Sequence, residues 1–216
     1  MDILNFWGAV MIIVAGLAAL ALSVPAAKKK EYTLMNLGFF FTLYGLTWLI
    51  ESPGVDQAVR SVAPRAMPWL HSFLTALIPI PFSAYLVNVF GKGFFSSMRW
   101  LYYSTIAYAA FAIAYDLFTP GELLSPTINT VVLAFWCVLG GLNVILVQDR
   151  PGSGITVLKV TLYLFFLSLA YDNLIIMGAL SWTFRLGHFN ILVLFTGMVY
   201  IALRRIRSSM NSEIHQ

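Results

Sequence analysis

The chain has 216 residues, of which 60% are apolar and only 10% are charged, and its formal net charge at neutral pH is +4. Soluble domains are nearer half apolar and a quarter charged, so this composition excludes an ordinary soluble domain. The basic residues form no dense stripe for a nucleic acid, and the single cysteine, Cys137, excludes an internal disulfide and a thiolate metal cluster.

Seven apolar stretches are long enough to cross a bilayer, which takes about twenty residues. They predict helices over residues 3–24, 32–50, 68–90, 100–119, 128–147, 160–180 and 186–203. The longest connector, residues 51–67, has room for a short amphipathic helix on the membrane surface. We therefore predict an all-α integral membrane protein, with a seven-helix bundle over residues 1–203 and a basic tail over residues 204–216.

The distribution of lysine and arginine predicts the orientation. Of the 13 basic residues, all but Arg60, Arg65 and Arg185 lie on one set of helix flanks. Short cytoplasmic loops carry the excess of Lys and Arg. We therefore expect the N-terminus outside and the C-terminus in the cytoplasm, in a multi-pass protein of the inner or plasma membrane.

Two prolines interrupt the third predicted helix near its middle, in the segment Ile78-Pro-Ile-Pro-Phe. Each proline removes a backbone hydrogen bond and clashes with the carbonyl four residues before it. Such a break in lipid needs neighbours or a cavity that satisfy the freed carbonyls. The segment predicts a kink, which either opens a cavity or only shapes the packing.

Asp172 lies near the middle of the sixth predicted helix. A charge at that depth costs about 3 kcal/mol on insertion scales. We expect Asp172 to face the bundle interior, with His71, His188 and Asn190 as its leading partners. It either binds a ligand or only ties helices together by hydrogen bonds.

The predicted helix directions gather further polar and tryptophan side chains in the outer half of the bundle. The predicted ligand-binding residues are Asp172, Asn173, His71, His188, Asn190, Asp116, Trp48 and Glu51. Trp, His and Glu near helix ends are also normal residues of the membrane interface. Both interpretations stay open for all of these residues except Asp172.

Three stretches together resemble a known family: the aromatic run Phe39-Phe-Phe-Thr-Leu-Tyr-Gly-Leu-Thr-Trp-Leu, the Ile78-Pro-Ile-Pro-Phe break followed by Phe90-Gly-Lys-Gly, and the helix end Arg204-Arg-Ile-Arg. The chain is similar to the bacterial seven-transmembrane receptors with diverse intracellular signalling modules. The resemblance implies a sensor that precedes a phosphatase or histidine-kinase output domain. Those receptors carry a sensor domain before the first helix and continue beyond the seventh, and this sequence shows neither part.

Three functions compete. A sensor would bind a small or lipid-like ligand in the outer half and signal through the seventh helix, where the spacing of Leu203, Ile206 and Met210 could seed a homodimer. A small secondary transporter would use Asp172 as its proton or ion site. A zinc-dependent membrane hydrolase needs about three protein ligands, and only His71 and His188 lie in the bundle. We assign no metal, cofactor or catalytic residues, and we favour the sensor.

Overall fold

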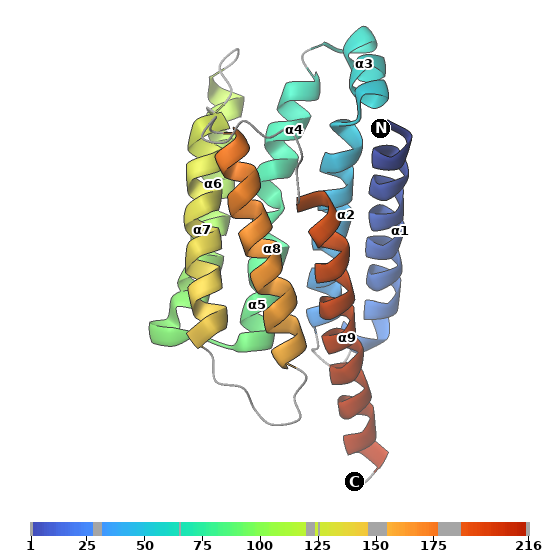
Figure 1. Ribbon diagram of the computed structural model, residues 1–216, viewed down its shortest axis with the longest axis vertical. Helices are drawn as coiled ribbons and strands as arrows, with labels where there is room; N and C mark the ends of the chain where they lie inside the picture. Colours follow the sequence, from blue (N-terminus) through green and yellow to red (C-terminus); the bar gives the residue numbers. More distant parts are fainter. Residues whose placement is uncertain are drawn as a thin grey trace. The chain divides into compact units, whose positions relative to one another are not determined.

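A computed structural model describes residues 2–27, 32–64, 66–119, 124, 126–146, 155–176 and 187–214 (Figure 1). All regular structure in these residues is helical, which confirms the all-α prediction. The chain divides into two compact units. One comprises Met1–Val89 and Tyr102–Ser125, and the other comprises Phe90–Leu101 and Pro126–Gln216.

The first unit holds α1 (Asp2–Ala27), α2 (Thr33–Ile50), α3 (Pro53–Val62), α4 (Ala66–Leu77), nearly all of α5 (Pro79–Phe90) and most of α6 (Ser97–Phe118). The second unit holds the short 3-10 helix η1 (Phe94–Ser96), the first turn of α6, α7 (Pro126–Leu146), α8 (Ile155–Ile176) and α9 (Gly187–Ile214). The described residues of the seven predicted segments lie in helices or at their ends, with three differences from the prediction. The third segment is two helices, the last continues to Ile214, and the connector 51–67 holds α3.

Within the described ranges, three stretches are long and apolar enough to cross a membrane: Phe6–Pro25, Thr33–Ile50 and Ala66–Phe90. Val131–Leu146 and Ile191–Arg204 are apolar but shorter. Large apolar side chains stay exposed along these helices, among them Met11 and Val138. Lipid is the solvent in which such surfaces are stable, so the protein is a membrane protein.

Glycines bring α1 and α2 into backbone contact. A Cβ atom on Gly16 would lie 2.6 Å from the backbone nitrogen of Thr42, and one on Gly38 would lie 2.8 Å from the carbonyl oxygen of Gly16. Gly45 meets the backbone of Ala9 and Ile13 in the same way. Small residues allow this close approach, which lipid-embedded helices use for van der Waals packing.

The proline segment divides α4 from α5 at Ile78, as its sequence predicts. Pro79 and Pro81 have no N–H to donate to the carbonyls of Thr75 and Leu77, whereas the N–H of Ile78 still donates to Leu74 at 3.0 Å. The chain therefore loses two helical hydrogen bonds here and then resumes its course in α5.

The break does not shift the packing of α4 and α5 against α6. Before it, the Ser72 hydroxyl donates to Asp116 at 2.6 Å. After it, the Ser83 and Thr105 hydroxyls are 3.0 Å apart. The spacing from Ser72 to Ser83 equals that from Thr105 to Asp116, so both halves keep one antiparallel register with α6.

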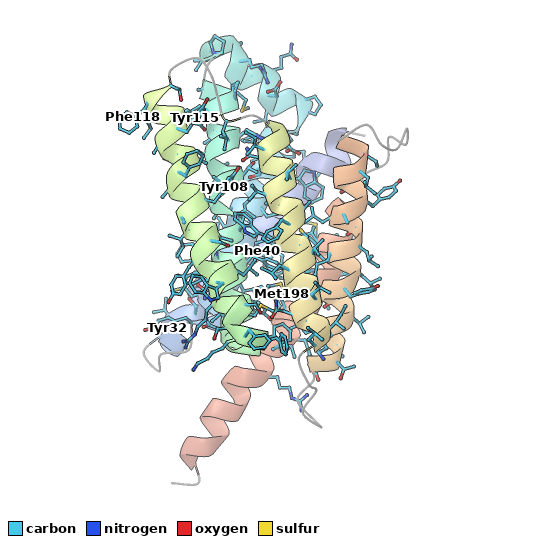
Figure 2. All side chains as sticks on the ribbon, turned by 90° about the vertical axis from the view of Figure 1, so that its left-hand side faces the viewer. Tyr32, Phe40, Tyr108, Tyr115, Phe118 and Met198 are labelled. Carbon is cyan, nitrogen blue, oxygen red and sulfur yellow. The ribbon has the colours of Figure 1, made fainter. Side chains whose placement is uncertain are left out.

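The opposing face of α6 is lined with alanines and tyrosines. Ala109 and Ala112 are buried against Ala76, while Tyr108 and Tyr115 pack at the edge of this cluster. Figure 2 shows Tyr108, Tyr115 and Phe118 spaced along α6. The buried alanines of α6 pack against Ala76 of α4, next to the polar residues described below.

Candidate functional site: a polar belt on α4

Asp116 is a buried carboxylate near the C-terminal end of α6, with 9% of its surface exposed. Its Oδ2 accepts the hydrogen bond from Ser72, and its Oδ1 accepts one from the backbone N–H of Leu124 at 2.9 Å. Leu124 is itself buried. Asp116 thus joins α4, α6 and the segment that follows α6, with an acceptor role for each oxygen.

The residue before Ser72 makes a second polar contact with a different helix. His71 Nε2 lies 2.9 Å from Oε1 of Glu51, which directly follows α2. Both side chains are partly exposed. We call Glu51, His71, Ser72, Asp116 and the Leu124 N–H the polar belt, because two consecutive residues of α4 connect it to α2 on one side and to α6 on the other.

The helix α3 begins next to the polar belt, immediately after Glu51 and Ser52. Val55 and Val59 pack at the edge of the apolar cluster of Ile50, Met67 and Leu74. On its exposed side, Arg60 Nε donates to Asp56 at 2.7 Å. The expected amphipathic helix is therefore present, and its apolar face covers the connection between α2 and α4.

Trp48 has a packing contact in the structure. It is 8% exposed, and a Cβ atom on Gly8 would lie 2.8 Å from its ring. The indole therefore lies over the glycine and fills the space between α1 and α2.

Four predicted residues lie in the second unit. Asp172 is 8% exposed in α8. Asn173 follows it in α8, and His188 and Asn190 lie in the first turn of α9, but their side chains fall outside the described part of the structure. The partnership of Asp172 with His71, His188 or Asn190 therefore stays a prediction.

Of the eight predicted residues, the structure pairs Glu51 with His71 and places Asp116 in a separate contact with Ser72, the residue after His71. Ser72 and the Leu124 N–H were not predicted from the sequence. One signal in the sequence could have pointed to Ser72, because it directly follows the predicted residue His71. Its hydroxyl can donate a hydrogen bond to a carboxylate such as Asp116. No comparable signal marks Leu124, because a backbone N–H carries no residue identity.

Among the described side chains, no three His, Cys, Asp or Glu residues are arranged to hold a metal ion. Glu51 and His71 supply two such groups in contact with each other. The zinc hydrolase hypothesis therefore gains no support from the polar belt.

Comparison of the chain with protein-family models, with curated proteins and with solved structures finds no significant match.

Proposed function

We propose that the protein is a seven-span membrane sensor, with its N-terminus outside and its C-terminus in the cytoplasm. A small or lipid-like ligand acts at the polar belt on the outer side, and α9 carries the response inward to a cytoplasmic output. The observation that carries this proposal is the belt itself. It joins three helices through polar contacts on one turn of α4, and a ligand with matching donors and acceptors can exchange with those contacts.

The proline break makes the belt suited to switching. Ser72 lies before Ile78 and Ser83 lies after it, and each contacts α6. The two missing hydrogen bonds between them leave a weak point where α4 can bend relative to α5. A ligand shifts such an equilibrium only if it binds one arrangement better than the other, and exchange of the Ser72–Asp116 bond would supply that difference.

The continuity of α9 supports the output role. This helix runs from Gly187 to Ile214 without interruption, well past its apolar part, which ends at Arg204 (Figure 1). A continuous helix moves as a rigid element, so displacement of its membrane part reaches the basic residues Arg204, Arg205 and Arg207. Leu203, Ile206 and Met210 follow helical spacing and would place two copies side by side.

The coupling between belt and tail can be measured without knowing the ligand. The reporter is disulfide crosslinking of a Met210→Cys variant in a Cys137→Ala background. We expect Ser72→Ala to change the crosslinking rate by about fivefold or more, because fivefold corresponds to the lower end of usual coupling free energies between sites. Ser61→Ala, which removes an exposed hydroxyl of α3, should leave the rate unchanged. An unchanged rate in a folded Ser72→Ala variant contradicts the sensor proposal.

The orientation is tested by thiol labelling in intact cells. Cysteines placed at Lys29 and at Ser208 should resist a membrane-impermeant maleimide, and a cysteine at Gln57 on α3 should react. The excess of basic residues on the Lys29 side is the physical reason. If Lys29→Cys is labelled from outside, the proposed orientation is wrong.

A transporter remains the second candidate because Asp172 is buried within α8. Intramembrane carboxylates often mark proton or ion pathways. The test is proton flux into proteoliposomes that contain the protein. A flux that is abolished by Asp172→Asn would favour the transporter over the sensor.

A further inference from the structure

The turn between α5 and α6 has an unusual backbone. Gly91 and Gly93 have φ angles of +77° and +72°, and the same left-handed region is occupied by Phe95 (φ 48°) and Ser96 (φ 62°). Glycine adopts this region freely, whereas a residue with a Cβ atom does so at a cost in free energy. Two such residues in succession persist only where the surroundings hold them.

Contacts within the second unit hold this turn in place. The Ser97 hydroxyl lies 2.5 Å from Oδ1 of Asn143 on α7, and Asn143 in turn donates to Leu139 at 2.8 Å. A Cβ atom on Gly93 would lie 2.6 Å from the Met98 side chain, which is completely buried. The end of the turn is therefore fixed to the C-terminal part of α7.

The exposed side chains of the turn are apolar and basic. Phe94 and Phe95 are 59% and 86% exposed, and their rings meet edge to face with centroids 4.4 Å apart. Lys92 and Arg99 flank them and are exposed. Neither makes an ion pair with a carboxylate anywhere in the described ranges. We call residues 91–99 the aromatic loop.

We propose that the aromatic loop is a docking site for anionic phospholipid. Phe94 and Phe95 enter the boundary between headgroups and acyl chains, while Lys92 and Arg99 bind lipid phosphates. Exposed phenylalanines on a strained backbone are unfavourable in water, and insertion into lipid removes that exposure. Lys92 and Arg99, which have no carboxylate partner within the described ranges, match an anionic surface in charge. The proposal rests on the membrane placement of the chain and not on the sensor function.

The test uses the full chain with Ser96→Cys in a Cys137→Ala background, labelled with a bimane fluorophore. It is reconstituted into phosphatidylcholine vesicles that contain the same small fraction of brominated phosphatidylglycerol or brominated phosphatidylcholine. Bromine quenches the fluorophore on contact. We expect stronger quenching by the brominated phosphatidylglycerol, and a preference for that lipid that falls about fivefold for each charge removed in Lys92→Gln and Arg99→Gln.

Two further variants separate the parts of the site. Phe94→Ser with Phe95→Ser should lose quenching by both lipids. Arg60→Gln, which removes an exposed basic residue of α3, should leave the lipid preference intact. Equal quenching of the parent protein by both lipids overturns the anionic preference. Absence of quenching in a protein with intact helical circular dichroism shows that the loop faces water or a protein partner and overturns the proposal. Neither result depends on ligand binding or on α9, so the sensor proposal would stand.

Discussion

Replacing Gly38 by alanine should destabilise the protein by about 1–3 kcal/mol, the usual cost of overpacking. The new methyl group would lie 2.7 Å from the Leu20 side chain and 2.8 Å from backbone atoms of Gly16 and Leu20. Backbone atoms of α1 cannot rotate away as a side chain can, so the two helices must separate. The measurement is the unfolding of the purified protein in mixed micelles with increasing dodecyl sulfate.

The matched control is Gly54→Ala on α3, where a Cβ atom would meet nothing within 4 Å. Alanine favours helix over glycine by up to about 1 kcal/mol, so this variant should be neutral or more stable. The same Gly→Ala substitution should therefore destabilise the protein at Gly38 and not at Gly54. Equal effects at Gly38 and Gly54 would show that α1 and α2 are not in backbone contact.

The second large effect is expected at Asp116. Asp116→Ala leaves the Ser72 hydroxyl and the Leu124 N–H without their acceptor. Each buried polar group that loses its partner costs about 1–3 kcal/mol, so the loss of both contacts should cost roughly 2–6 kcal/mol of stability. Asp116→Asn should lose much less, because the amide oxygen can accept from Leu124 and the amide nitrogen can donate to Ser72.

The same unfolding assay compares these variants with Asp56→Ala, whose partner Arg60 is exposed on α3. An exposed pair four residues apart on a helix contributes about 0.3–0.5 kcal/mol. We therefore expect a clear gap between Asp116→Ala and Asp56→Ala. If both lose the same small amount, the belt does not hold α4 against α6.

The approximate positions of the helices could be predicted from the sequence, but the contacts between the helices could not. Long apolar blocks determine where helices form, and Pro79 and Pro81 determine where the third one breaks. The contact of Gly16 with Gly38 was not predictable in this way. A helix that faces lipid is apolar on every side, so its hydrophobic pattern does not mark the face that meets a neighbour.

The polar belt shows the same limit. Glu51, His71 and Asp116 were singled out because the predicted helix directions place them together in the outer half of the bundle. Their actual partners depend on the register between helices, which no local pattern encodes. The backbone of Phe95 was harder still to foresee, since phenylalanine ordinarily avoids the left-handed region.

The common register on both sides of Ile78 has a consequence for the length of this segment. Successive residues of a helix are about 100° apart around its axis. Inserting or deleting one residue between Pro79 and Pro81 would therefore turn all of α5 by that angle relative to α4. If Ser72 kept its hydrogen bond to Asp116, Ser83 would point away from Thr105. If Ser83 kept its contact with Thr105, Ser72 would point away from Asp116. We infer that substitutions in this segment are tolerated more easily than any change in the number of its residues.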